Sequence, residues 1–271
     1  MTDTVVHLRT RYYQQFDADP CLQVPAESFG GWKTAQLPLD LKRSALVVMH
    51  AWDYGSAESF PGWRRVVEYI PRAERICKEV LPDLLRSVRS SPMQVFHVVS
   101  EGDYYRDYPG FKQAKSLVPG TPKKTKSIDP GEVYSQLKAF RSKAVYVGEG
   151  NQVDVQAGFA RLDFAAEARP LDDEGIAEDA DQLLALCREH QVDHLIYVGF
   201  ALNWCLLQSP GGMVDMRRHG LLCSTIPEAV TAVENKESAR REGEKMSALW
   251  RVALEYGFVY ALADFSEALK P

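Results

Sequence analysis

Two patterns of apolar residues alternate along this chain. Short runs of consecutive apolar residues are typical of strands buried on both faces of a sheet, whereas apolar residues that recur every three or four positions indicate amphipathic helices. Pro82 interrupts one helical pattern and predicts a kink or a break there, and Gly220 predicts the end of another helix. Helices are expected over residues 73–88, 131–140, 177–190, 203–220 and 237–256, and strands over residues 45–50, 94–99, 144–147, 194–199, 221–224 and 258–262.

This order of elements predicts an α/β fold. A strand, a helix and a second strand in succession imply a right-handed crossover and therefore a parallel sheet. We expect a six-stranded, mainly parallel sheet sandwiched between two layers of helices, as in doubly wound three-layer folds. Residues 45–50 and 194–199 are the most continuously apolar runs, which places these two strands side by side at the centre.

Residues 1–43 differ from the remainder of the chain. Prolines and glycines punctuate them, and they carry an aromatic cluster without any periodic pattern. We expect an N-terminal arm over residues 1–43 that is not part of the core, followed by the α/β domain over residues 44–271. The arm is expected to pack on its own domain or on a partner subunit, and the protein is predicted to be a homo-oligomer.

Composition and charge restrict the partners. The 271 residues carry a formal net charge of −5, which gives no reason to expect a nucleic-acid partner. No apolar stretch approaches the roughly 20 residues of a membrane span, and the first 20 residues lack the apolar run of a signal peptide. The five cysteines are odd in number and form no CxxC pair, so we expect a reducing, cytoplasmic setting. The partner that we expect is a small-molecule substrate.

Reactive side chains follow several of the predicted strands. In an open parallel sheet, ligands bind outside the carboxyl ends of the strands. The side chains expected at this edge are His50, Trp52 and Asp53 after the first strand, Ser100, Glu101, Asp103, Tyr104 and Tyr105 after the second, Glu149 and Asn151 after the third, and Ala201, Asn203, Trp204 and Cys205 after the fourth.

Cys205 is the candidate nucleophile of this set. It would lie in the first turn of a helix, where the helix dipole favours the thiolate and the free backbone amides could hold an oxyanion. His50 could act as its base, with Glu149 orienting the imidazole. Two plainer alternatives stay open: a helical cysteine that is inert packing, and a histidine that is only a polar residue at the end of a strand.

The segment from Asp193 to Cys205, which contains Gly199-Phe200-Ala201, resembles the nucleophile motif of the isochorismatase-like cysteine hydrolases. That superfamily includes nicotinamidases and N-carbamoylsarcosine amidases. Residues 45–53 resemble its first strand, and residues 145–159 resemble its third-strand region. The resemblance covers roughly residues 43–265 and leaves the N-terminal arm outside.

The resemblance implies a catalytic aspartate, lysine and cysteine. Only Cys205 carries over, because His50 stands where the family has aspartate and Glu149 where it has lysine. The resemblance also implies a cis peptide at Phe200-Ala201 and an oxyanion hole formed by backbone amides of Ala201 and Cys205.

Some members of the family bind a metal after the second strand. Asp103 matches the metal-binding aspartate of nicotinamidases, but Tyr105 stands where a histidine ligand is expected. The remaining oxygen ligands are a poor match for zinc. We therefore predict no metal and no other cofactor.

Two functions follow from these replacements. In the first, Cys205, His50 and Glu149 form a rewired triad that hydrolyses a C–N bond of a small amide-like substrate. In the second, the site has lost hydrolysis and the protein is a ligand-binding or scaffold module. The substrate-binding candidates are Trp52, Asp53, Asp103, Tyr105, Asn203 and Trp204, whose aromatic rings suggest a planar ligand.

Overall fold

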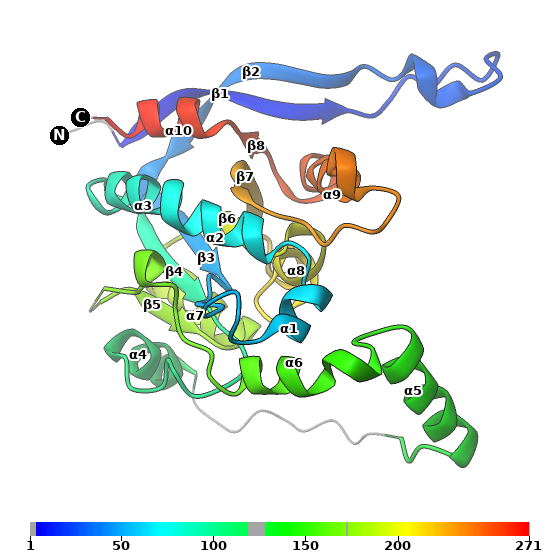
Figure 1. Cartoon of the computed structure of the whole chain (residues 1–271). Helices are drawn as coiled ribbons and strands as arrows, with labels where there is room; N and C mark the ends of the chain where they lie inside the picture. The colour runs from blue at the N-terminus through cyan, green and yellow to red at the C-terminus, as the bar shows by residue number, and fades with distance from the viewer. Residues whose placement is uncertain (1–3, 119–127, 172, 271) are drawn as a thin grey trace.

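A computed structural model describes residues 4–118, 128–171 and 173–270. These residues form one eight-stranded sheet in the order β2-β1-β8-β7-β6-β3-β4-β5 (Figure 1). The six strands from β8 to β5 run parallel, and the two from the N-terminal arm pair antiparallel at one edge. The strands are β1 (Val5–Gln14), β2 (Gly31–Asp40), β3 (Ser44–Met49), β4 (Gln94–Val98), β5 (Gly175–Ala177), β6 (His194–Gly199), β7 (Leu222–Val230) and β8 (Val259–Tyr260).

The expected centre of the sheet is confirmed. β3 and β6 pair in parallel from Ser44 opposite His194 to Met49 opposite Gly199, and every residue of both strands is buried. The backbones approach so closely at the end of β6 that a Cβ on Gly199 would lie 2.0 Å from the Met49 carbonyl oxygen. Gly199 also has a φ of +114°, which side-chain-bearing residues rarely adopt. Glycine thus allows β3 and β6 to end side by side.

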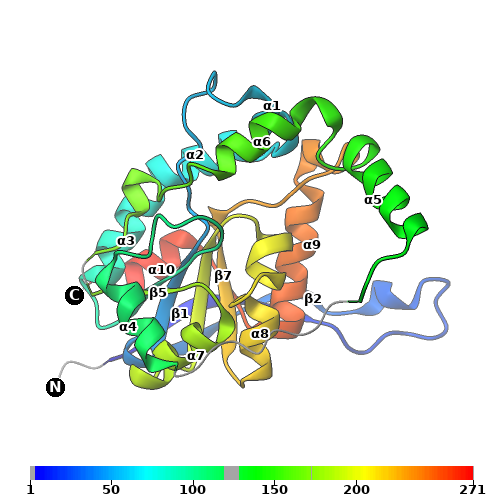
Figure 2. The ribbon, with the colours of Figure 1, turned by 90° about the horizontal axis from the view of Figure 1, so that it is seen from below.

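Helices cover both faces of the sheet, as predicted (Figure 2). Alternate β3 residues face the two layers: Leu46 and Val48 pack in one core, and Ala45 and Val47 in the other. The first layer contains α1 (Pro61–Val66), α2 (Ile70–Glu79), α3 (Leu81–Arg89) and α10 (Leu262–Ala268). The second contains α4 (Pro109–Leu117), α7 (Ala180–Glu189), α8 (Met213–Arg218) and α9 (Gly243–Arg251).

The helix break expected near Pro82 is observed. α2 ends at Glu79, and α3 begins at Leu81 with Pro82 in its first turn, where the missing amide hydrogen is not needed. The helix expected over residues 203–220 is shorter and divided into a π-helical turn over Leu202–Leu206 and α8. None of the helices in the described part of the chain is long and apolar enough to cross a membrane.

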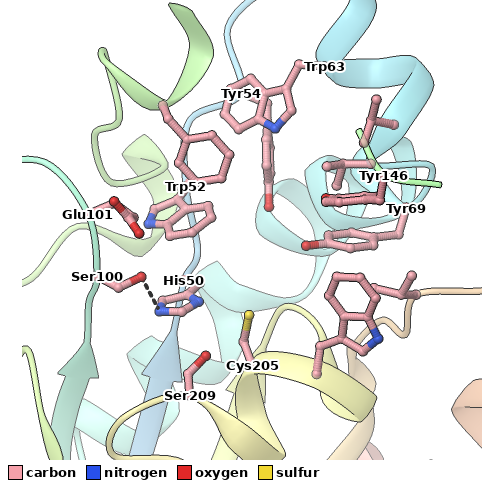
Figure 3. A pocket seen from close by; sticks show the side chains of 15 residues that line it. His50, Trp52, Tyr54, Trp63, Tyr69, Ser100, Glu101, Tyr146, Cys205 and Ser209 are labelled. Carbon is pink, nitrogen blue, oxygen red and sulfur yellow. Dashed lines mark hydrogen bonds between the residues drawn. The ribbon is translucent and has the colours of Figure 1, made fainter. Parts of the chain in front are cut away.

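The strand predicted at residues 144–147 is wrong. Helix α5 (Glu132–Ala144) runs to Ala144, and α6 (Gln152–Phe159) follows after a turn that contains a cis Tyr146-Val147 peptide. The sheet instead gains β5, whose three residues form too short a run to be recognised from the apolar pattern. The apolar residues after Ala144 therefore do not report a strand, and Tyr146 points into a pocket (Figure 3).

The prediction that residues 1–43 are not part of the core is also wrong in part. β1 and β2 form a hairpin, and β1 pairs with β8 through Thr10 and Arg11. Leu8 and Leu39 are almost fully buried in the main core. Only the tip of this hairpin, residues 15–30, extends away from the body (Figure 1). The homo-oligomer expected from the arm stays a prediction.

Candidate active site

A cavity of about 250 Å³ opens at the carboxyl ends of β3 and β6, where the strand-end rule places a ligand site. Its floor comes from the ends of these two strands and the π-helical turn after β6, and its upper wall comes from α1 and α6 (Figure 3). The lining residues are His50, Trp52, Tyr54, Trp63, Val66, Val67, Tyr69, Ser100, Glu101, Tyr146, Phe159, Trp204, Cys205, Ser209 and Val233.

Cys205 lies in the π-helical turn directly after the cis Phe200-Ala201 peptide. Its sulfur points into the cavity (Figure 3). Burial raises the pKa of this thiol above its ordinary value, and the Ser209 side chain and the Ala201 backbone act in the opposite direction without reversing the shift. Cys205 is therefore a protonated thiol near neutral pH. Ala201 caps the same turn, so the two residues predicted to form an oxyanion hole belong to one short segment.

His50 ends β3 with a left-handed backbone, at a φ of 53°. Its Nε2 is hydrogen-bonded to Ser100 Oγ at 3.0 Å, and its ring stacks on Trp52. Its Nδ1 is buried and has no hydrogen-bond partner among the described residues. Burial lowers the pKa of His50 from 6.5 to about 3, so the imidazole is neutral near pH 7.

Glu149 lies outside the cavity. It belongs to a 3-10 turn over Glu149–Asn151, its side chain is 72% exposed, and Oε1 lies 3.1 Å from the ammonium nitrogen of Lys143. The structure does not bring it to His50, because the strand that was expected to deliver it does not form. The carboxylate that does line the cavity is Glu101, which follows β4.

Of the predicted substrate-binding residues, Trp52 and Trp204 line the cavity. Trp52 donates from Nε1 to the Tyr104 hydroxyl at 2.8 Å, and Trp204 packs edge to face against Tyr146. Each indole therefore contacts a tyrosine ring or hydroxyl. Asn203 does not line this cavity, because its side chain makes two hydrogen bonds with the Val233 backbone, at 2.8 and 2.9 Å.

The other candidates lie elsewhere. Asp53 is exposed and accepts from its own loop at Gly55, and Asp103 is exposed and paired with Arg106. Tyr105 is buried and donates to Glu178 at 2.9 Å. Nowhere in residues 4–118, 128–171 and 173–270 do three His, Cys, Asp or Glu side chains gather to hold a metal. The absence of a metal or cofactor remains a prediction.

Three tyrosines were missed as site residues. Figure 3 shows the hydroxyls of Tyr54, Tyr69 and Tyr146 directed into the space beside the Cys205 sulfur. Burial raises the pKa of all three, so they are neutral hydrogen-bond donors. Tyr54 is 3% exposed, and its hydroxyl has no partner within the described residues. Tyr54 follows the first strand, so the strand-end rule could have found it, whereas Tyr69 and Tyr146 come from segments without such a signal.

The charge on the cavity wall is negative. Glu101 is the one charged residue among the described residues that line it, and no lysine or arginine belongs to this lining. Most of the wall is aromatic. The cavity therefore suits neutral planar molecules and disfavours anions, because burying a carboxylate without a cation carries a large desolvation penalty.

Comparisons with known proteins agree with this fold. No protein-family model matches the chain, and no curated protein matches it in sequence. The structure is similar to a cysteine hydrolase from Pseudomonas syringae pv. phaseolicola 1448A, with 15% identity, a TM-score of 0.50, and coverage of 86% of this chain and 95% of that one. It also matches an isochorismatase family protein from Burkholderia thailandensis, at 15% identity, a TM-score of 0.46 and coverage of 85% and 97%. A third match is N-carbamoylsarcosine amidase from Thermoplasma acidophilum, at 14% identity, a TM-score of 0.43 and coverage of 81% and 96%.

At these identities the similarity concerns the fold alone. The chain has the isochorismatase-like α/β fold that the segment from Asp193 to Cys205 predicted, with eight strands in the described sheet in place of six.

Proposed function

We propose that the chain is a binding protein for a small, neutral, planar molecule, built on an isochorismatase-like fold. One observation carries this proposal: His50 is buried against Trp52, and none of the described carboxylates is hydrogen-bonded to its imidazole. A cysteine nucleophile needs a base or a cation beside it, and this imidazole is poorly suited to either role.

The protonation states of Cys205 and His50 favour a binding protein over an enzyme. Burial raises the pKa of the Cys205 thiol above its ordinary value and lowers the pKa of His50 to about 3. Both shifts oppose transfer of the thiol proton to the imidazole, because each favours the neutral form of its group. The resting site is therefore a neutral thiol beside a neutral imidazole.

The expected ligand follows from the wall of the cavity. The aromatic rings of the lining offer apolar surface, and the hydroxyls of Tyr54 and Tyr69 offer donors for a carbonyl oxygen. Glu101 disfavours an anion. An aromatic amide such as benzamide combines these features, whereas benzoate has the same shape with the wrong charge.

A thermal-shift titration tests this proposal. Benzamide is expected to raise the melting temperature in a concentration-dependent way, and benzoate is not. Tyr69→Phe should weaken the benzamide effect several-fold, while Tyr134→Phe, at an exposed position outside the cavity, should leave it unchanged. Equal shifts with the two compounds, or no shift with either, would refute the proposed ligand class.

The placement of Cys205 supports a second candidate, a cysteine hydrolase that acts on the C–N bond of a small amide. His50 would take the thiol proton, the sulfur would attack the carbonyl carbon, and backbone amides of Ala201 and Cys205 would hold the oxyanion. His50 would then protonate the leaving amine, and water would release the acyl group and restore the thiol. Glu149 takes no part in this version of the mechanism.

Alkylation by iodoacetamide, followed for each peptide by mass spectrometry, separates the two candidates. The binding protein predicts that Cys205 reacts more slowly than a free thiol throughout about pH 5 to about pH 9 and that His50→Ala leaves this profile in place. The exposed Cys21 in the same sample serves as the reference for intrinsic reagent reactivity. If Cys205 reacts well below about pH 8.5 and loses this reactivity in His50→Ala, the hydrolase is the better description.

A further inference from the structure

Helix α5 exposes a face that the rest of the described chain does not cover. None of its 13 residues is buried. Four large side chains, spaced at one, four and seven positions after the first, lie on one side and are 57–68% exposed: Val133, Tyr134, Leu137 and Phe140. A helix gains most of its stability by packing such a face, so an unpacked apolar stripe indicates a docking surface.

The charge of α5 is basic. The helix contains Glu132 against Lys138, Arg141 and Lys143, which gives a formal net charge of +2. By helical geometry, Lys138 and Arg141 border the apolar stripe on one side. The surface therefore suits an acidic partner that also carries apolar side chains.

The hairpin tip, residues 15–30, has the complementary composition. It contains Asp17, Asp19 and Glu27 and no basic residue, which gives a net charge of −3. It also exposes the apolar side chains of Phe16, Leu22 and Val24, at 55%, 42% and 50%.

The tip is also held in shape without help from a partner. The Ser28 hydroxyl accepts from the Asp19 amide at 2.6 Å and donates to the Asp17 carbonyl at 2.7 Å, and the Cys21 amide donates to Asp19 Oδ1 at 2.9 Å. A segment that is already ordered loses less entropy when it binds.

The two surfaces lie at the same end of the molecule but apart from each other. In Figure 1 the hairpin tip and α5 both project to the right, the tip above α9 and α5 below it; in Figure 2 both lie to the right of α9, and neither covers the other. A two-fold axis midway between them would place the tip of each copy on α5 of the other. Two identical contacts would then close the assembly, as a symmetric dimer requires.

We propose that α5 is the docking site for the hairpin tip of a second copy of this chain, in a reciprocal two-fold dimer. The acidic, apolar tip packs on the basic, apolar helix, and each dimer contains this contact twice. This contact is independent of the function proposed for the cavity.

Light scattering at micromolar protein concentration and low salt provides the first measurement. The unmodified chain is expected to be a dimer, and a monomer would overturn the proposal. Lys138→Glu/Arg141→Glu gives an acidic helix that repels the acidic tip, and Asp17→Lys/Glu27→Lys gives a basic tip that repels the basic helix. Each of these two charge-reversal variants alone should raise the dissociation constant at least about tenfold.

Mixing the two charge-reversal variants is the decisive step. In the mixed dimer one contact has the original charges and the other has both charges reversed, so dimers should reappear. A mixture that stays monomeric would contradict the pairing. Arg86→Glu/Lys270→Glu is the matched control, because these exposed residues belong to α3 and to the C-terminal end of the described chain, on the opposite side of the molecule, and should leave the dimer intact.

Two further variants test the contact without relying on the folding of the charge-reversed hairpin. Leu137→Ser/Phe140→Ser removes apolar contact from α5 without touching the tip, and replacing residues 16–29 by a two-residue turn removes the tip without touching α5. Both are expected to be monomeric with an unchanged circular dichroism spectrum. A dimer that survives either change would show that another surface joins the copies.

Discussion

The imidazole of His50 lies face to face with the indole of Trp52, with ring centroids 4.6 Å apart and planes inclined by 14°. The stack shields the imidazole from water, and its hydrogen-bond partner, the Ser100 hydroxyl, carries no charge. Burial is therefore what lowers the pKa of His50. A residue that looks like a catalytic base in the sequence is thereby kept neutral.

The protonation state of His50 can be measured directly. Because its pKa in the folded protein lies near 3, nuclear magnetic resonance of the labelled ring should show the neutral form throughout about pH 5 to about pH 8. The unfolded chain takes up this proton near pH 6.5, so the corresponding part of the stability is present above that pH and is lost as the pH falls towards 3. The exposed His219 ring serves as the internal reference. A His50 midpoint between pH 6 and 7 would remove the basis of the proposed binding function.

Glu174 is predicted to stabilise the fold through a buried network beneath the sheet edge. It is 8% exposed, and it accepts from Arg89 at 2.7 and 2.9 Å and is hydrogen-bonded to His97 at 2.9 Å. Burial raises its pKa, but the bonds from His97 and Arg89 outweigh this and lower the pKa to about 2. Glu174→Gln should reduce the free energy of unfolding by about 3 kcal/mol at pH 7.

The pH dependence provides the check on Glu174. A carboxylate with a lowered pKa contributes its stability above the unfolded pKa of about 4.5 and loses it as the pH falls towards 2. Urea unfolding between neutral and acid pH should therefore show a smaller acid loss in Glu174→Gln than in the unmodified chain. Asp83→Asn, which removes an exposed pair with Arg86, should change stability by less than about 1 kcal/mol. Equal effects of the two substitutions would contradict this role for Glu174.

Gly158 is predicted to allow α6 to pack closely against α1 at the upper wall of the cavity. A Cβ on this glycine of α6 would lie 2.2 Å from Cε3 of Trp63, a residue of α1 that lines the cavity. Gly158→Ala should force α6 and α1 apart, lower the free energy of unfolding by about 1–3 kcal/mol and weaken ligand binding. Gly150→Ala is the matched control, because its Cβ meets nothing within 4 Å. Calorimetric unfolding and the benzamide titration measure both effects, and wild-type behaviour in both would disprove the prediction.

Asn203 is predicted to hold one wall of the cavity in place. Its amide donates from Nδ2 to the Val233 carbonyl at 2.9 Å and accepts at Oδ1 from the Val233 amide at 2.8 Å. Asn203→Ala leaves both backbone groups without these partners and should cost about 1–3 kcal/mol of unfolding free energy. Gln208→Ala, at an exposed position of the following turn, should cost much less. Faster hydrogen exchange confined to the segment around Val233 is the expected signature; an unchanged exchange rate would show that another contact holds it.

Local pattern explains what could be predicted from the sequence. The runs at residues 45–50 and 194–199 are apolar at nearly every position, which only a strand buried on both faces requires, so their place at the centre of a parallel sheet followed directly. Pro82 acts on its own helix through a missing amide hydrogen, which is equally local. The position of Cys205 after β6 followed from the order of elements and from the resemblance of the segment that precedes it.

Only the tertiary structure shows that Glu149 lies at the surface and that His50 is a buried, neutral ring. The apolar run after Ala144 fits a strand by itself, but the chain continues α5 to that point and then turns, which leaves Glu149 at the surface beside Lys143. A histidine at a strand end is compatible with a base or with a buried neutral ring. The choice depends on how Trp52, two residues further along the same loop, stacks on the ring, and on Ser100, which follows β4. The periodicity of apolar residues indicates which element a segment forms and which of its faces is buried. The pKa and the hydrogen-bond partners of a side chain depend instead on all the residues that pack around it.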